Sequence, residues 1–142
     1  MDVIAKRRKH IGVLFIVLML VSLFMIFVGF VQRMFWLSII FVIITLVNLY
    51  LSMDYAYTPF EILKYDERNK ALVHKNGTIK VDEIDEITVK RFSDFKGFHF
   101  NVGNLYIKTN NKTIYRFKYI SSVGSVRGVI IYLKHNSRLP QD

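Results

Sequence analysis

One long uncharged stretch constrains this chain more than any other feature. Between His10 and Asp54 the only charged side chain is Arg33, which lies in the middle of the stretch. A single helix of that length would run for about 65 Å, roughly twice the thickness of a hydrocarbon core. Divided at Gln32–Arg33, the stretch becomes two apolar segments, 11–31 and 34–53, and each has the ~20 residues that one crossing requires. The sequence therefore predicts a two-helix transmembrane hairpin, 11–53.

Charges beside the first apolar segment predict its orientation. A basic cluster lies directly before it: Lys6, Arg7, Arg8 and Lys9. Because an excess of Lys and Arg keeps a flanking segment in the cytoplasm, we expect residues 1–10 to be a basic cytoplasmic N-terminus. The turn at Arg33 would then lie outside, and the chain after Asp54 would return to the cytoplasm. A cleaved signal peptide is the alternative, but the apolar run is longer than such peptides use and no A-x-A-like site ends it.

The remainder of the chain reads as one small β domain, 59–136, followed by a tail, 137–142. Short segments rich in β-branched and aromatic residues alternate with turn residues. Asn76-Gly77 is the strongest hairpin signal, because a tight type I′ turn needs positive φ at both central residues. Segments 105–109 and 113–118 predict a second hairpin across Asn110-Asn111. The chain contains no cysteine, which excludes a disulfide scaffold and a thiolate metal site.

The periodicity changes near the end of the chain. Apolar residues recur there at spacings of three and four, which marks one face of an amphipathic helix. They are Ile120, Val123, Val126, Ile130 and Leu133. Ser121 and Ser122 stand before this face as candidate N-caps. The predicted fold is therefore a membrane helical hairpin plus a mainly-β domain, in which a curved antiparallel sheet or barrel is closed by a C-terminal helix.

This outline resembles the bacterial pleckstrin-homology-like (PH-like) domains that follow transmembrane helices in small membrane proteins. The similar segments are Asn76 to Ile87 (NGTIKVDEIDEI) and Gly103 to Thr109 (GNLYIKT). The first is a turn, a strand and a short step into the next strand, and the second is similar to a characteristic strand of the family. The resemblance extends from Pro59 to about His135. It implies a PH-like fold and carries over no catalytic or ligand-binding residue.

Candidate catalytic and metal-binding chemistry is sparse. The histidines are too far apart in sequence for a metal motif, and no serine stands in a nucleophile elbow. The acidic cluster between Asp82 and Glu86 has Ile84 at its centre and lacks the glycine that a calcium loop requires. We therefore expect no enzyme activity, no cofactor and no metal.

Basic and aromatic side chains around one loop form the candidate binding face. Its members are Lys90, Arg91, Phe95, Lys96 and Phe98. Basic residues held near an anionic inner leaflet gain about 1 kcal/mol each, and phenylalanine can enter the interface. The alternatives are charge that only confers solubility, and aromatics that only fill the β domain. A nucleic-acid partner is not expected for a domain tethered to a membrane.

The sequence thus predicts a multi-pass protein of the cell membrane whose N-terminus and C-terminal domain lie in the cytoplasm. Three functions are candidates for such a protein. The arrangement is similar to small self-immunity proteins of bacteriocin producers, which implies non-enzymatic protection against a membrane-active antimicrobial peptide. The partners would be the anionic inner leaflet and either the peptide or a membrane protein. The alternatives are an adaptor or accessory subunit of an exporter or stress sensor, and a binder of anionic lipid surfaces.

Overall fold

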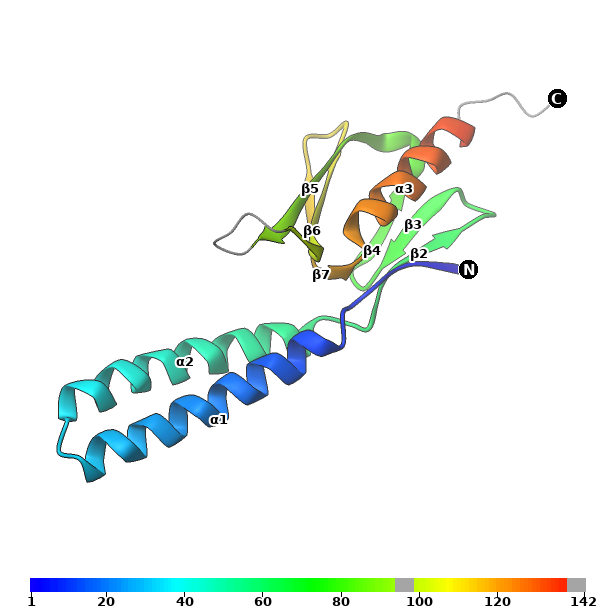
Figure 1. The fold of residues 1–142 in the computed structure, drawn as a ribbon. Coiled ribbons are helices and arrows are strands. Elements are labelled where there is room, and N and C mark those ends of the chain that lie inside the picture. The colour runs from blue at the N-terminus through cyan, green and yellow to red at the C-terminus, as the bar shows by residue number, and fades with distance from the viewer. Residues whose placement is uncertain (94–98, 138–142) are drawn as a thin grey trace. The chain divides into compact units, whose positions relative to one another are not determined.

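The computed structural model describes residues 1–93 and 99–137 of the chain. Its elements follow one another as β1 (Asp2–Lys6), α1 (His10–Val31), α2 (Phe35–Tyr57), β2 (Glu61–Asp66), β3 (Ala71–His74), β4 (Gly77–Lys80), the 3-10 turn η1 (Val81–Glu83), β5 (Ile84–Ser93), β6 (His99–Thr109), β7 (Ile114–Ser121) and α3 (Val123–Ser137). They form two compact units, which are described separately. One contains Lys9–Thr58 and the other contains Met1–Arg8 together with Pro59–Asp142 (Figure 1).

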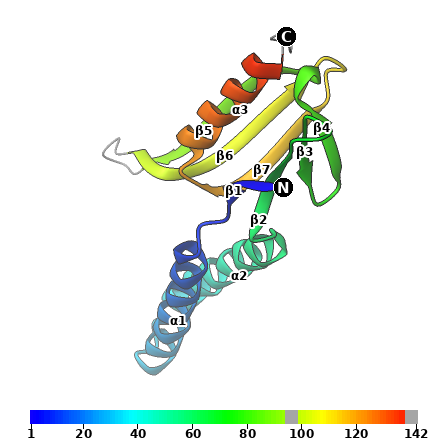
Figure 2. The same ribbon diagram turned by 90° about the vertical axis from the view of Figure 1, so that its right-hand side faces the viewer.

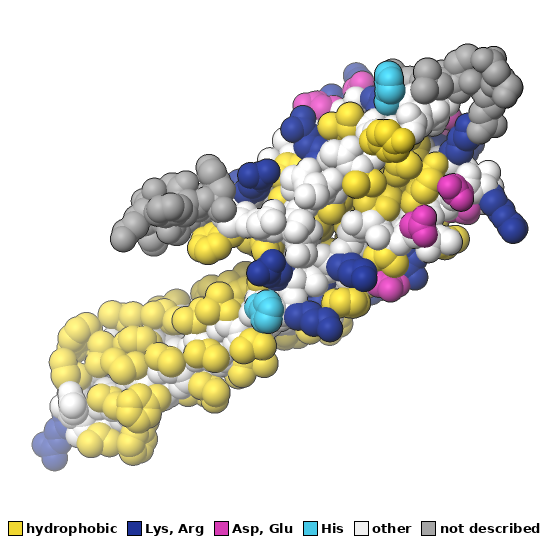
Figure 3. Space-filling model, turned by 45° about the vertical axis from the view of Figure 1, so that its right-hand side comes forward, with side chains coloured by type: hydrophobic (Ala, Val, Ile, Leu, Met, Phe, Trp, Pro, Cys, Tyr) yellow, Lys and Arg dark blue, Asp and Glu magenta, His cyan; other side chains and the backbone are white. Residues whose placement is uncertain are grey.

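The helical unit is an antiparallel pair of helices joined by a tight turn. The turn is where the sequence predicts it, and Arg33 adopts a positive φ of 57° there. α2 continues to Tyr57, one turn beyond the predicted end of the apolar segment. Only 6% of the apolar window of α1 and 11% of that of α2 is buried, so these side chains face outward (Figure 3). Both helices are long and apolar enough to cross a membrane, whereas a helix in the core of a soluble protein would bury most of these side chains.

Small and hydroxyl-bearing residues join α1 to α2. Gly29 has no room for a side chain, because a Cβ there would overlap the Ser38 hydroxyl. The Ser38 hydroxyl donates to the Ile26 carbonyl at 3.1 Å, and the Thr45 hydroxyl lies 3.0 Å from that of Ser22. These contacts satisfy hydroxyl groups that would otherwise be costly in an apolar environment.

The described residues of the β unit form two antiparallel sheets, the short 3-10 turn η1 and the α-helix α3. The first sheet has the order β1-β2-β3-β4 and the second has the order β5-β6-β7. The predicted hairpins and the C-terminal helix are thus present, but the strands form two sheets instead of one continuous curved sheet. An isolated bridge between Arg7 and Ile120 connects the residue after β1 to β7. α3 contacts β5 and β6 of the second sheet, as well as η1 and β1 (Figure 2).

The N-terminal segment is part of this β unit, whereas the sequence alone assigned residues 1–10 to a basic flank. β1 pairs antiparallel with β2, and the register joins Lys6 to Glu61. The amide of Arg7 donates to the Phe60 carbonyl at 2.8 Å, and that of Arg8 donates to the Tyr119 carbonyl at 3.0 Å. The two strands that pair here are separated in sequence by both apolar helices.

Local geometry differs from the sequence prediction at two places. In the β3–β4 hairpin, His74 pairs with Gly77, so the turn lies one residue earlier than Asn76-Gly77. Gly77 has φ of +149°, which explains why glycine is needed there although it pairs in the strand. α3 begins at Val123, and Ile120 belongs to β7.

The core of the β unit lies between the sheets and α3. Its fully buried members come from every layer, and they include Leu63, Leu72, Leu105, Ile120 and Ile130. Alternation along the strands and the three- and four-residue spacing along α3 direct these side chains inward.

His74 makes the stability of this unit depend on pH. Its ring packs edge-on against Tyr115 and Phe117, each at 5.5 Å between ring centroids, and its Nδ1 accepts the Asn76 amide at 3.2 Å. Burial lowers the pKa of His74 below its ordinary 6.5. The unfolded chain therefore binds more protons, and this contribution to stability is present above pH 6.5 and is lost as the pH falls below it.

We expect His74→Asn to flatten the fall in stability of the β unit as the pH decreases below 6.5. Asparagine keeps an acceptor for the Asn76 amide and does not titrate. Melting temperatures of the full chain in detergent across this range test the prediction, and His135→Asn, at an exposed position, is the control. Parallel pH profiles for the wild type and His74→Asn would contradict it.

Candidate functional site

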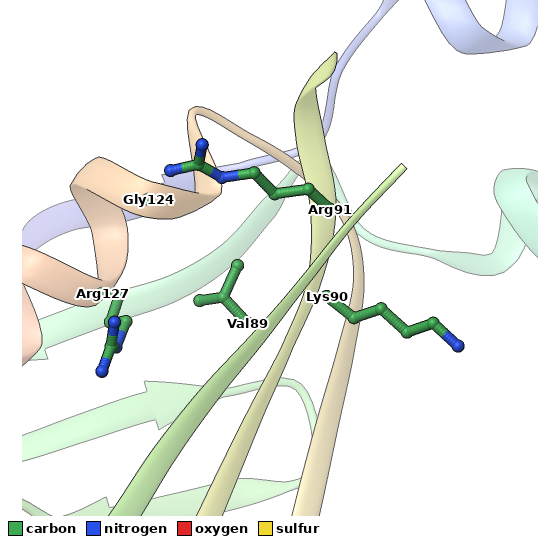
Figure 4. A pocket seen from close by; sticks show the side chains of 5 residues that line it. All are labelled: Val89, Lys90, Arg91, Gly124 and Arg127. Atoms are coloured by element: carbon green, nitrogen blue, oxygen red, sulfur yellow. The ribbon is translucent and has the colours of Figure 1, made fainter. Parts of the chain in front are cut away.

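The described part of the predicted binding face lies on β5. Lys90 and Arg91 follow one another in this strand, so their side chains point to opposite sides of it (Figure 4). Arg91 points toward the start of α3, and Lys90 points away from that helix. Phe95, Lys96 and Phe98 lie outside the described residues. The two described cations of the predicted face are therefore divided between two surfaces.

A pocket of about 510 Å3 opens between β5 and α3. It is lined by Val89, Lys90, Arg91, Gly124 and Arg127. Val89 and Arg91 are two residues apart and share the side of β5 that faces the helix, while Gly124 and Arg127 lie one turn apart on α3 (Figure 4). We call the pair Arg91 and Arg127, one from each wall, the arginine pair.

Gly124 makes space for the guanidinium group of Arg91. A Cβ at position 124 would overlap Nη2 of Arg91, so the arginine lies directly against the backbone of the first turn of α3. At Gly128, one turn further on, an added Cβ would meet nothing within 4 Å. The two glycines of α3 therefore differ: one allows a close approach and the other does not.

The position of Arg91 is fixed from the opposite side by Gly103 on β6. The two residues are paired in the ladder, and a Cβ at Gly103 would collide with the backbone of Lys90 and Arg91. Only glycine permits this close approach of the two strands. The Gly103 of the GNLYIKT segment thus supports the backbone that carries the arginine.

Three of the five lining residues of the pocket are cationic: Lys90, Arg91 and Arg127. Within residues 1–93 and 99–137, no ion pair joins a carboxylate to either member of the arginine pair, whereas Lys64 and Glu61 form one at 2.6 Å on β2. Arg116 on β7 lies over the ring of Tyr106, with its guanidinium carbon 5.7 Å from the ring centroid.

Aromatic side chains lie at the end of β5 and the start of β6. Phe92 is 36% exposed and Phe100 is 54% exposed. The ring of Phe92 also lies 6.3 Å from that of Tyr119. At this end of the domain, where the sequence predicts an aromatic binding face, the two described phenylalanine side chains are therefore exposed to solvent.

The four basic residues predicted to set topology fall on both sides of the unit boundary. Lys6 ends β1, and Arg7 and Arg8 continue into the β unit through their backbone bonds to Phe60 and Tyr119. Lys9 precedes α1 and its carbonyl accepts the Tyr55 hydroxyl at 3.2 Å. These residues therefore connect the sheet to the first helix.

Sequence reasoning did not include Arg127 in the site. It is 36 positions after Arg91, on a different element, and only the packing of α3 along β5 brings the two to one pocket. The spacing of Gly124 and Arg127 on α3 does not by itself predict a pocket. The two residues can be assigned to one only when the strand that packs against this helix is known.

Over the described ranges, no group of three His, Cys, Asp or Glu side chains is placed to hold a metal ion. Comparison with known proteins gives no relative to guide an assignment. No family model, curated protein or solved structure matches the chain.

Proposed function

We propose that this chain is a membrane-anchored PH-like protein that protects its own cell against a membrane-active antimicrobial peptide, without enzymatic turnover. The observation that carries the proposal is the pairing of β1 with β2 across the apolar helices. If the helices span the membrane, a sheet made from both flanking strands requires both ends of the hairpin to lie on one side. The domain is then attached to the membrane at two points of the chain, after Arg8 and before Pro59.

Support for a PH-like fold comes from the order of the elements. Four antiparallel strands, three antiparallel strands and a C-terminal helix follow one another in the β unit, and the bridge at Arg7 and Ile120 links the two sheets. In this interpretation the transmembrane hairpin is an insertion between the first and second strands of the domain.

The basic cluster before α1 supports a cytoplasmic location for both flanks. We expect Arg33→Cys, at the turn, to react with an impermeant thiol reagent in intact cells, and Asn110→Cys, in the β6–β7 turn, to react only after permeabilisation. The wild-type chain has no cysteine, so each variant reports a single position. Labelling of Asn110→Cys in intact cells would show that the β unit lies outside the cell and that the proposed topology is wrong.

Protection would act at the membrane through the basic and aromatic end of the domain. The exposed rings of Phe92 and Phe100 offer apolar area, which stabilises contact with the interface by roughly 25 cal/mol per Å2 removed from water. The basic residues add attraction to an anionic leaflet, which salt weakens. The domain would thereby engage the peptide or stabilise the bilayer at the place where the peptide acts.

Expression in a sensitive strain tests this proposal. We expect survival in killing curves with a panel of cationic pore-forming peptides, including any encoded beside the gene, to rise for at least one peptide. A variant with Ala5→Asp, designed to unfold the β unit while keeping the helices, is the matched control and should give no protection. No gain against any peptide would count against immunity.

An adaptor role is the second candidate, and one observation favours it. Val129 and Tyr132 are three residues apart on α3, share a helix face and are exposed. Such an apolar strip fits contact with a membrane protein partner. The adaptor interpretation predicts no change in peptide killing when the chain is expressed alone.

A further inference from the structure

We propose that one face of the second sheet is a docking site for an acidic, extended segment of a partner protein. The site lies on the side of β5, β6 and β7 that points away from the core. The inference goes beyond the proposed function, because it requires neither the antimicrobial peptide nor the bilayer. We call this surface the outer sheet face, and its members are Thr88, Lys90, Tyr106, Lys108, Ile114 and Arg116.

The strand register places these side chains on one surface. Leu105, Ile107 and Phe117 alternate with them along β6 and β7 and are buried in the core. Because successive side chains of a strand point to opposite faces, the neighbours of these core residues point outward. On β5 the same holds for Lys90, whose side chain points away from α3 (Figure 4). The outer sheet face is therefore a continuous surface across three strands.

A tyrosine–arginine pair forms the centre of this surface. Tyr106 of β6 is in register with Arg116 of β7, and the exposed guanidinium of Arg116 lies over the tyrosine ring. A planar guanidinium presents a fork of donors that matches the two oxygens of one carboxylate. Tyrosine and arginine are also among the residue types that contribute most to the binding energy of protein interfaces. The pair is therefore suited to bind an aspartate or glutamate side chain.

Lysines extend the positive charge to the other strands. Lys90 is exposed on β5, and Lys108 follows Tyr106 by two residues on the same side of β6. Glu86, in register with Lys108, is an acidic residue at the border of this surface. Cations thus outnumber carboxylates, so the outer sheet face is complementary in charge to an acidic partner.

An exposed apolar residue lies beside the central pair. Ile114 is 63% exposed and precedes Arg116 by two residues on the same side of β7. Side chains two residues apart in a strand are separated by about 7 Å. An extended segment with a carboxylate and an apolar side chain two residues apart has the same spacing and can contact both. A polar surface with an apolar contact at its side is typical of protein interfaces.

A bilayer and a single-stranded nucleic acid are the competing occupants. Both would use an aromatic ring as a contact surface, either in the membrane interface or as a platform for bases. The ring of Tyr106 is half-buried, and Arg116 lies over it. The centre of the outer sheet face therefore offers hydrogen-bond donors instead of aromatic area, which favours carboxylates.

The first experiment measures peptide binding to the full chain in a non-ionic detergent by calorimetric titration. The probe is a short peptide with glutamate at every second position and isoleucine in place of the central glutamate. The matched probe has glutamine in place of each glutamate. We expect the acidic peptide to bind, its affinity to fall as salt is added, and the glutamine peptide not to bind. Short-chain phosphatidylglycerol and single-stranded DNA are separate probes for the competing occupants.

Variants of Arg116 test whether the peptide binds at the outer sheet face. We expect Arg116→Gln to weaken binding of the acidic peptide by about tenfold or more, because it removes both the charge and the fork of donors. Arg116→Lys keeps the charge but not the planar fork, and should weaken binding to a smaller extent. Arg68→Gln, at an exposed arginine in the β2–β3 turn of the other sheet, is the matched control and should bind like the wild type.

Ile114→Thr tests the apolar contact. It should weaken binding severalfold, because it removes apolar area from the interface while keeping a β-branched side chain in the strand. Ile131→Thr changes another exposed isoleucine, on α3, and should leave the affinity unchanged. Both positions are exposed, so the melting temperatures should stay close to that of the wild type.

Absence of binding by the acidic peptide would overturn the proposal, and the charge on this face would then serve solubility alone. Equal affinities of Arg116→Gln and the wild type would also overturn it. Binding of phosphatidylglycerol or DNA without binding of the acidic peptide would assign the face to that ligand instead of a protein. Peptide binding that depends on both Arg116 and Ile114 would support the proposal, whether or not expression of the chain protects cells against any antimicrobial peptide.

Discussion

Ala5→Asp is expected to unfold the β unit of the full chain while leaving its two apolar helices intact. Ala5 is 1% exposed and belongs to the core, although it lies before the first helix. A carboxylate placed there has no water around it, and a buried unpaired charge costs about 4 kcal/mol or more. That is a large part of the stability of a domain of this size. Limited proteolysis in detergent would then cleave the region after Pro59 and spare the helices.

Thr78→Asp is the control for this variant. It adds the same charge to an exposed position of the same sheet, on β4 at the opposite edge. We expect it to change the stability of the β unit by about 0.5 kcal/mol or less. If Ala5→Asp remained as resistant to protease as Thr78→Asp, β1 would not be part of the folded domain.

Ile130→Ala is expected to lower the free energy of unfolding of the β unit by about 2–5 kcal/mol. Ile130 is fully buried in α3 and belongs to the core cluster. Removing three carbons leaves a cavity that the surrounding strands fill only in part. The melting temperature of the full chain in detergent, followed by near-ultraviolet circular dichroism, measures the change.

The neighbouring residue provides a matched control. Ile131 is 45% exposed, so Ile131→Ala removes the same atoms from a position outside the core. We expect it to cost about 0.5 kcal/mol or less, and Leu133→Ala, at a partly buried position against the core, to cost an intermediate amount. Equal melting temperatures for the Ile130 and Ile131 variants would show that α3 does not cover the sheets in the way described.

Local patterns were sufficient to predict most elements of this chain. The break at Arg33 follows from the cost of a charge in hydrocarbon, and the hairpin across Asn110-Asn111 follows from turn chemistry. The face of α3 that contains Val126 and Ile130 follows from its periodicity, and both residues are buried. These features depend on residues close in sequence, which is why a pattern can predict them.

The division of the strands into sheets depended on contacts between distant segments. Asp2–Lys6 is short and is followed by basic residues, so its composition predicted only a flank. Its partner, β2, begins at Glu61, after both helices, and no local pattern encodes a pairing over that separation. The one-residue shift of the β3–β4 turn has a similar origin, since the register of Leu72 with Ile79 places both side chains in the core.

The sequence by itself determined that the chain has two apolar helices, an antiparallel β domain and a basic, aromatic segment around Lys90 and Arg91. Only the tertiary structure decided that β1 belongs to that domain, that these two cations point to opposite sides of β5, and that Arg91 and Arg127 line the same pocket. The physical reason is that hydrophobic period and turn propensity act within a few residues. The choice of a partner strand, or of the helix that covers a strand, is made by burial across the whole domain.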